Sequence, residues 1–513
     1  MKKILFNIIL LTSLCACSSF LEPDSPSEYV PKSVNALNEM LLGDAYPLAT
    51  SEGLFNLHHA FDDDIEMSED CILQTVTRGI VGLQYIYSWN PQMFELYPAQ
   101  TSVSLWSKYY QYILGTNAAL DYLNDVKGAA EEKAYVAAQA YALRAFYYFN
   151  LVNLFGEPYN YNKNADGVPL KLTSNLSSSF EKRETVAKVY EQIVKDLNAA
   201  EENFLLLPID QQHAAGYRIN LPAVQLLHAR VCLHMEDMEG AARYAKKVIG
   251  DWGFELYDLK SFEKETTIKA GEDASYPNYV SLDNPETIWV YGNSGDFTGI
   301  IGASDKMEDG STYGYYVNVS RDLIACYKDE GDLRKTLYLV EELRGPLSAK
   351  PEQLKPAAGH YLPWSKCGMQ YNNKVKAKTE FGMSLRLSEA YLILAEAVYD
   401  TDETLALKMI NDLREKRYAE NVDYEVHYSG EDLLNFIQEE RRRELCFEGQ
   451  RWFDLRRYGM PRFERRWVEL GVNLGKYVIE KGDAAYTLPI PVNAIERNSA
   501  LTQNKLTTEK TLQ

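Results

Sequence analysis

The sequence of 513 residues lacks the short motifs that mark common catalytic and nucleotide-binding sites. It contains no GxSxG, HExxH or GxxxxGK[ST] motif and no EF-hand spacing. The usual sequence signals of a serine hydrolase, a zinc protease, a P-loop protein and an EF-hand calcium-binding protein are therefore absent. Acidic residues are abundant, so a glycosidase with a catalytic pair of carboxylates is an alternative. The missing motifs favour a protein that binds its ligand without catalysis.

Cysteine is scarce, with seven in the chain. Cys15 and Cys17 belong to the N-terminal segment, and the other five show no CxxC spacing: Cys71, Cys232, Cys326, Cys367 and Cys446. Because five is an odd number, we expect at least one free thiol, and the spacing argues against a zinc site. Cys232 and Cys446 lie in helical patterns and are expected to be buried.

Positive charge is also in deficit, with 53 Lys and Arg against 73 Asp and Glu and a formal net charge of −20. This balance argues against nucleic acid as a partner and against attraction to anionic lipid. After the N-terminal segment, no apolar run is long enough to span a bilayer. Hydrophobic residues at 46% nonetheless predict a folded protein with a substantial core.

The N-terminus has the pattern of an exported lipoprotein. Lys2 and Lys3 precede the short apolar run ILFNIILLTSL, as in a signal peptide. The sequence Leu-Cys-Ala-Cys at 14–17 matches a lipobox and predicts acylation of Cys17, and the alternative is an ordinary signal peptide with an incidental cysteine. We predict a signal peptide over 1–16 and a lipid-anchored, Ser- and Pro-rich tether over 17–32, with the lipid as the membrane attachment.

Helical periodicity dominates much of the remaining chain. The predicted helices of the N-terminal half cover 34–42, 106–123, 131–155, 186–203, 223–235 and 239–249. Ala229 and Ala241 are small side chains of the kind that lets two helices approach closely in a tetratricopeptide-type pair. We expect three or four such pairs in a degenerate repeat.

The stretch from 384 to 459 organises the C-terminal half. Leu387, Leu394 and Val398 share one helical stripe, and a second stripe follows the short polar hinge at 400–403, so we predict an antiparallel helix pair. The run QEERRRE at 438–444 then stands between apolar residues. A catalytic cluster is one interpretation, but we favour a solvated face or an ion-pair network, because no nucleophile or metal-ligand set lies nearby.

Several regions look irregular. Residues 85–100 contain Pro91 and Pro98 and predict a loop, and 251–371 predict short strands and ligand-facing loops. In HHAFDDDIEMSED at 58–70, the adjacent His58 and His59 would diverge, so we favour an acidic loop over a metal site. Residues 486–492 predict an extended segment, and the last residues a frayed end.

Four motifs in a fixed order resemble the SusD/RagB family of outer-membrane nutrient-binding lipoproteins. They are the lipoprotein-type start at Cys17, LRAFYYFNLVNLFGEPY at 143–159, a stretch ending in ERRRELCFEGQRWFDLRRYG at 440–459, and YTLPIPVNAIERNSALTQN at 486–504. The resemblance implies a mainly α fold: a tetratricopeptide-like scaffold over 33–255, packed against a less regular region over 256–513 with loops and short β elements. It also implies a partner, a SusC-like TonB-dependent barrel in the outer membrane that receives the ligand from the cell surface.

The chemistry of the aromatic residues predicts a glycan ligand. The chain has 37 tyrosines, whose rings combine an apolar face with a hydroxyl group and so suit contact with sugars. The candidate contacts in the irregular regions are Trp89, Tyr97, Tyr291, Phe297, Tyr313, Tyr315 and Tyr316, and ordinary packing is the alternative for each. A peptide-binding member of the same family, a surface glycoside hydrolase and a structural adaptor stay open as alternatives. No cofactor is expected, and a structural calcium ion stays open.

Overall fold

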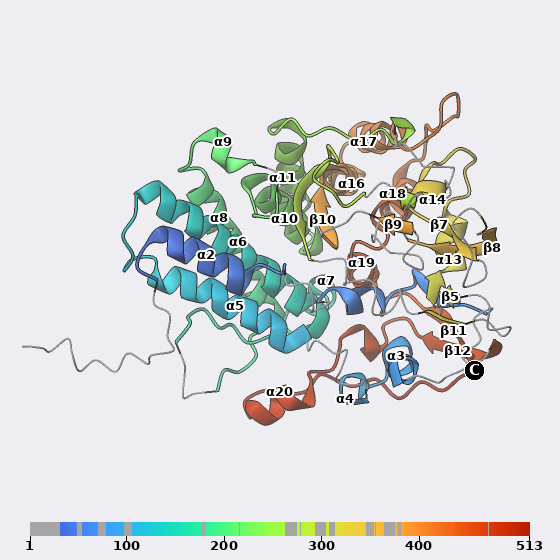
Figure 1. Ribbon diagram of the computed structural model, residues 1–513, viewed down its shortest axis with the longest axis horizontal. Coiled ribbons are helices and arrows are strands. Elements are labelled where there is room, and N and C mark those ends of the chain that lie inside the picture. The colour runs from blue at the N-terminus through green and yellow to red at the C-terminus, as the bar shows by residue number, and fades with distance from the viewer. Residues whose placement is uncertain are drawn as a thin grey trace, which may run out of the picture.

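The computed structural model describes most of the chain from residue 31 onward. The described residues are 31–48, 54–69, 78–96, 105–175, 180–214, 216–261, 274–276, 279–292, 304–306, 313–315, 317–344, 353, 355–363, 375–377, 381–469 and 471–513. Helices dominate these residues and the strands are short, which confirms the predicted mainly α fold (Figure 1). The predicted signal peptide, Cys17 and nearly all of the tether lie outside the described residues.

All six helices predicted in the N-terminal half are present, with ends that differ by a few residues. They are α2 (Val34–Ala45), α5 (Leu105–Tyr122), α6 (Ala130–Phe155), α8 (Val186–Phe204), α10 (Leu221–His234) and α11 (Met238–Gly250). Polar side chains cap several N-termini: Thr185 caps α8, Asn220 caps α10 and Asp237 caps α11, each by accepting a backbone N–H of the first turn. The helices lie side by side as a layer (Figure 1).

Helix α6 is the centre of this layer. It packs between α5 and α8, and every residue from 142 to 155 is buried. A helix that is apolar on all sides belongs in an interior, whereas a surface helix shows one apolar stripe. Helix α6 is therefore an interior helix of the layer.

The two predicted helix hairpins downstream are also confirmed. In the first, Ala229 and Ala241 are fully buried, and a Cβ added at Gly240 would lie 2.8 Å from Sγ of Cys232, so α10 and α11 meet closely. The second consists of α16 (Leu387–Val398) and α17 (Glu403–Glu415), where Asp402 in the predicted hinge caps α17. Helix α11 packs against α16, so the second hairpin extends the helical layer.

The strands form two-stranded ladders, several of which join distant segments. The antiparallel ladders are β1 (Ile65–Met67) with β6 (Val317–Val319), β3 (Thr287–Tyr291) with β10 (Met383–Arg386), β4 (Ser304–Lys306) with β5 (Tyr313–Tyr315), β7 (Val340–Arg344) with β8 (Lys355–Leu362), and β11 (Phe463–Glu469) with β12 (Val472–Ile479). β2 (Ala274–Tyr276) and β9 (Val375–Ala377) pair in parallel. Strands within 251–371 agree with the prediction, whereas the β11–β12 hairpin was not predicted.

The described chain contains further helices, most of them short. They are the 3-10 helices η1 (Asn56–His59), η2 (Leu259–Ser261) and η4 (Ala484–Tyr486) and the α-helices α3 (Arg78–Tyr87), α4 (Met93–Leu96), α7 (Tyr159–Asn162), α9 (Ile209–Gln212), α13 (Arg321–Cys326), α14 (Arg334–Leu337), α18 (Gly430–Leu445), α19 (Arg451–Arg457) and α20 (Val492–Arg497). In the described part of the chain, no helix combines the length and the apolar composition needed to cross a membrane.

Two local predictions are wrong. Residues 85–100 are not a continuous loop, because α3 extends to Tyr87 and α4 begins at Met93, two residues after Pro91. The C-terminal residues are not frayed: Asn504 donates to the carbonyl oxygens of Phe155 and Leu488, and Gln513 exchanges backbone hydrogen bonds with Lys476 of β12. Polar side chains without apolar periodicity hold this tail, so periodicity could not detect it.

Candidate ligand-binding site

The charged run of α18 forms a buried ion-pair network. Arg417 Nη2 lies 2.5 Å from Glu286 and 2.9 Å from Glu444, and Arg386 Nη1 lies 2.6 Å from Glu444, with all four side chains buried. Burial alone would raise the pKa of Glu444, but Arg417, Arg386 and Arg334 outweigh it and hold that pKa well below its usual range. The predicted ion-pair interpretation of this run is therefore confirmed.

The network continues along both sides of α18. Glu440 accepts from Arg334, Arg414 and Arg443, and Arg441 joins Glu389 to Asp454. Each of these carboxylates is fixed between arginines, which lower the pKa of Glu440 and Asp454 against the opposing effect of burial. A carboxylate held in this way stabilises the scaffold and is unsuited to exchange protons with a substrate.

The histidine- and aspartate-rich segment at 58–64 is a buried connection. His58 Nε2 lies 2.9 Å from the hydroxyl of Tyr109, and burial lowers the pKa of His58 to about 4. Asp63 accepts two hydrogen bonds from Arg451 at 2.7 and 2.8 Å, and Asp64 accepts one from Arg442 at 2.8 Å. Within the described residues, no group of three His, Cys, Asp or Glu side chains has a metal-binding arrangement.

Two of the predicted ligand-contacting rings lie in the core. Trp89 is fully buried, its indole N–H donates to the carbonyl oxygen of Phe61 at 2.9 Å, and the Arg465 guanidinium lies 4.0 Å from its ring centre. Tyr291 is 3% exposed and stacks on Trp289 with 4.6 Å between ring centres. Neither ring presents a face to a ligand, because the segments around them are covered by residues from distant parts of the chain.

Of the other five predicted contacts, two are residues of β5 and three lie outside the described part of the chain. Tyr313 and Tyr315 are the end residues of β5, where they pair with Lys306 and Ser304 of β4. Tyr97, Phe297 and Tyr316 lie outside the described residues. The prediction that these five residues contact a ligand stays a prediction.

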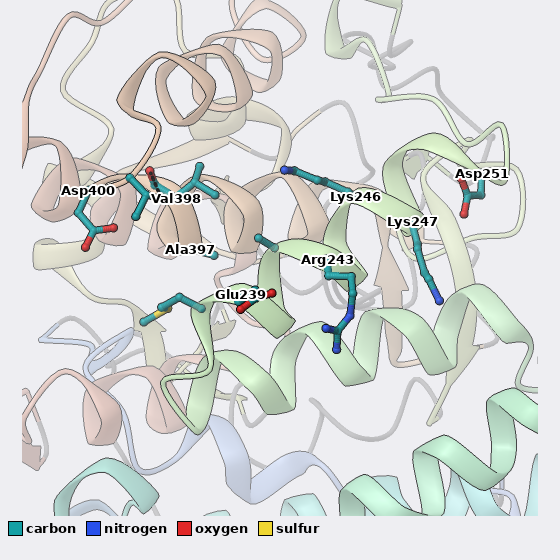
Figure 2. A pocket seen from close by; sticks show the side chains of 11 residues that line it. Glu239, Arg243, Lys246, Lys247, Asp251, Ala397, Val398 and Asp400 are labelled. Carbon is teal, nitrogen blue, oxygen red and sulfur yellow. Dashed lines mark hydrogen bonds between the residues drawn. The ribbon is translucent and has the colours of Figure 1, made fainter.

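One groove of about 810 Å³ lies between α11 and the end of α16 (Figure 2). Its apolar residues are Met238, Ala242, Ala397 and Val398, and its charged residues are Glu239, Arg243, Lys246, Lys247, Asp251 and Asp400. Lys247 is bound to Glu201 at 2.8 Å. The groove carries charges of both signs but has no aromatic lining, so it does not offer the ring face expected for sugar binding.

A smaller cleft of about 310 Å³ has the aromatic lining that the groove lacks. It lies between the first turns of α5, the segment around Pro169 and helix α20. Its apolar lining residues are Trp106, Tyr110, Pro169, Ala494 and Leu501, and its polar lining residues are Ser107, Lys171, Glu181, Asn493, Arg497 and Asn498. Sequence analysis missed this cleft, because Trp106 and Tyr110 follow an ordinary helical period and α20 comes from the opposite end of the chain.

Comparison with known proteins establishes the family. A family model described as "Starch-binding associating with outer membrane" matches residues 20–233, and one described as the SusD family matches residues 360–506. The chain belongs to the SusD/RagB family. The matched ranges contain α5, α6, α10 and the α16–α20 region, which are the parts of the scaffold described above.

Individual SusD/RagB relatives agree with this assignment. SusD-like protein P2 of Formosa agariphila is 27% identical over 429 residues, which are 78% of this chain and 79% of that protein. A SusD superfamily protein from Bacteroides thetaiotaomicron aligns with TM-score 0.67 and 23% identity over 92% of this chain and all of its own. A laminarin binding SusD-like protein aligns with TM-score 0.58 and 20% identity over 92% of this chain and 99% of its own. These structural similarities establish the fold.

Proposed function

We propose that this SusD/RagB protein captures a glycan at the outer cell surface and does not cleave it. The observation that carries the proposal is the match of residues 20–233 to a family model described as starch-binding and associating with the outer membrane. Solved proteins of the same fold include a SusD-like carbohydrate binding protein from Bacteroides vulgatus and the laminarin binding protein. The abundance of tyrosine supports the same class of ligand.

The described acidic residues support binding rather than hydrolysis. A glycosidase needs two carboxyl groups about 5 to 10 Å apart across a cleft, one of which must exchange protons. The carboxylates of the α18 network are instead buried against arginines. The aromatic cleft is lined by a single carboxylate, that of Glu181.

The proposal includes a route for the captured glycan. Acylation of Cys17 would hold the protein at the outer membrane, with the tether at 17–32 leading to a helical region over 33–255 and a C-terminal region over 256–513. A SusC-like TonB-dependent barrel would then receive the ligand. Tyr97, Phe297, Tyr313, Tyr315 and Tyr316 are the proposed ring contacts.

Titration calorimetry tests the capture function. The chain from residue 18 onward, which contains every described residue, is titrated with plant, host and microbial polysaccharides and with a peptide digest. Saturable binding of one glycan class without release of products is the expected result. Binding of peptides alone would replace glycan capture with peptide capture, and formation of shorter sugars would indicate hydrolysis.

Two variants separate ligand contact from packing. Tyr315→Ala is expected to weaken glycan binding with little change in Tm. Trp89→Ala is expected to lower Tm, because a buried Trp replaced by Ala costs about 3 to 5 kcal/mol. An unchanged affinity in a folded Tyr315→Ala variant would remove Tyr315 from the proposed contacts.

A further inference from the structure

We propose that the cleft beside Trp106 is a second ligand site, which binds one or two sugar rings. The sugar class rests on the proposed function, whereas the cleft itself follows from described residues alone. Helix α20 on one side of this cleft and strand β5 lie at opposite sides of the view in Figure 1. The cleft is therefore separate from the proposed contacts Tyr313 and Tyr315 of β5.

The apolar side of the cleft is rigid. Trp106 and Tyr110 lie one helical turn apart with 5.1 Å between ring centres, and Trp106 packs edge-to-face on Phe155 of α6. The hydroxyl of Tyr110 donates to the carbonyl oxygen of Pro169 at 2.8 Å, which fixes the ring. Tyr110 is half-buried whereas Trp106 is almost fully buried, so Tyr110 offers most of the ring surface that the C–H face of a pyranose could contact. Because the Tyr110 ring is already held in place, little conformational entropy is lost when the ligand binds.

The hydrogen-bonding state of the Trp106 indole N–H favours a polar ligand. The side chain of Trp106 lines the cleft and is only 6% exposed. Among the described residues, its N–H has no hydrogen-bond acceptor, although those of Trp89, Trp289 and Trp467 each donate to an oxygen. Because this nitrogen is not one of the fully buried polar atoms, water can reach it, and a sugar hydroxyl in the cleft could replace that water as the acceptor.

The polar residues that line the cleft offer both hydrogen-bond donors and acceptors. Glu181 and Arg497 have no ion-pair partner in the described part of the protein. Asn498 donates to the backbone oxygen of Glu181 at 2.8 Å and so ties α20 to the segment that bears this carboxylate. Sugar hydroxyls donate and accept at once, so a rim with a carboxylate, a guanidinium and amides matches them better than it matches an apolar ligand.

The volume of the cleft limits the size of the ligand that it can hold. Small-molecule pockets run from about 300 to 1,000 Å³, and this cleft of about 310 Å³ is at the lower end. A chain terminus or a side branch would fit, whereas a long glycan segment would extend over the rim.

Fluorine NMR of the chain from residue 18 onward, labelled with 5-fluorotryptophan, tests the site. The probes are glucose, galactose, mannose, xylose, glucuronic acid and their disaccharides, and Trp106→Phe assigns one of the seven tryptophan resonances. We expect a saturable shift of the Trp106 resonance with at least one probe. Ala494→Phe places a ring in the cleft and should weaken this binding at least about tenfold.

A matched control is Glu496→Phe, which adds the same ring at an exposed position of α20 that does not line the cleft. It should bind as the unmodified chain does. A Trp106 resonance that no probe shifts, in a protein that binds a polysaccharide by calorimetry, overturns the second site and leaves the capture function intact. A shifted resonance that Ala494→Phe does not affect also overturns it. A shift without polysaccharide binding supports the site and argues against capture.

Discussion

The helical layer around α6 and the C-terminal region around α18 fill their interiors differently. Around α6, the buried side chains are mostly aromatic and aliphatic, with Arg144 and Asp196 as a buried ion pair at 2.6 Å. Around α18, the buried Glu440 and Glu444 pair with arginines from other segments, among them Arg334, Arg386 and Arg414. Apolar burial is non-directional, whereas a buried charge requires its partner at hydrogen-bond distance.

Arg456 of α19 joins the two regions. Its guanidinium donates to the carbonyl oxygens of Asn153 and Gly156 at the end of α6 and to that of Tyr486. Burial without a carboxylate partner lowers the pKa of Arg456 to about 10, which still leaves it charged at neutral pH. A cation at a helix C-terminus satisfies free carbonyls and the helix dipole together. The helical layer is thus fixed to the C-terminal region by directional bonds.

The largest expected effect comes from breaking the charged interior. Arg417→Ala leaves Glu286 and Glu444 with fewer partners in a buried position, and the expected loss is about 3 to 5 kcal/mol in the free energy of unfolding. Urea denaturation measures it. Arg462→Ala is the control, because Arg462 is exposed and pairs with Glu464 at 3.2 Å, so it should cost less than about 1 kcal/mol. Equal losses in both variants would contradict the distinction between the two interiors.

The second-largest expected effect is a dependence of the free energy of unfolding on pH. In the folded state burial lowers the pKa of His58 to about 4, whereas the unfolded chain binds this proton near pH 6.5. The unfolded state therefore binds more protons between these values, and stability falls as the pH drops through this window, by about 3 kcal/mol for His58. In His58→Gln, the decrease in unfolding free energy from pH 6.5 to 4 should be smaller by about that amount. The same decrease in both proteins would show that His58 does not titrate in this way.

Acid acts on the α18 network at lower pH. Arginines hold the pKa of Glu444, Glu440 and Asp454 below the values of the unfolded chain. Their contribution is present above the unfolded pKa, near 4, and is lost as the pH falls further.

Sequence patterns predicted the part of the fold that depends on local periodicity. The stripe from Leu387 to Val398 and the acids of the hinge were enough to place α16 and α17. The charged run of α18 was correctly interpreted as an ion-pair network, but its partners Arg334 and Arg386 are far away in sequence and no pattern indicated these pairings. Trp89 shows the same limit, because it was expected in an exposed loop and Arg465, far along the chain, covers it.

The candidate site was harder to predict than the fold, for the same reason. Trp106 was assigned to a helix, and its cleft arises only where α20 packs near the start of α5. Aromatic residues in an irregular segment indicate a binding surface and a core equally well, so Tyr291 was chosen on a signal that could not distinguish them.

The third effect concerns the close contact of α10 and α11. Gly240→Ala introduces a Cβ 2.3 Å from Oδ2 of Asp237 and 2.8 Å from Sγ of Cys232, and we expect a loss of about 1 to 3 kcal/mol from overpacking. The matched control is Gly250→Ala at the end of the same helix, where a Cβ meets nothing within 4 Å and should be neutral or slightly stabilising. Thermal unfolding measures both. Equal Tm values would show that the helices separate without cost.

The smallest expected effect comes from removing a helix cap. It tests whether the helical layer is stabilised by local capping as well as by packing. Asp402 accepts the N–H of Leu405 at 3.0 Å and so caps α17, whereas Asp400, two residues earlier in the same turn, lines the groove of Figure 2. Loss of an aspartate cap costs about 1 kcal/mol, so Asp402→Ala should lower the free energy of unfolding by that amount and Asp400→Ala by much less. Because both variants remove one negative charge from the same turn, a difference between them isolates the hydrogen bond of the cap. Equal small losses would mean that charge near the helix N-terminus, and not the cap, stabilises α17.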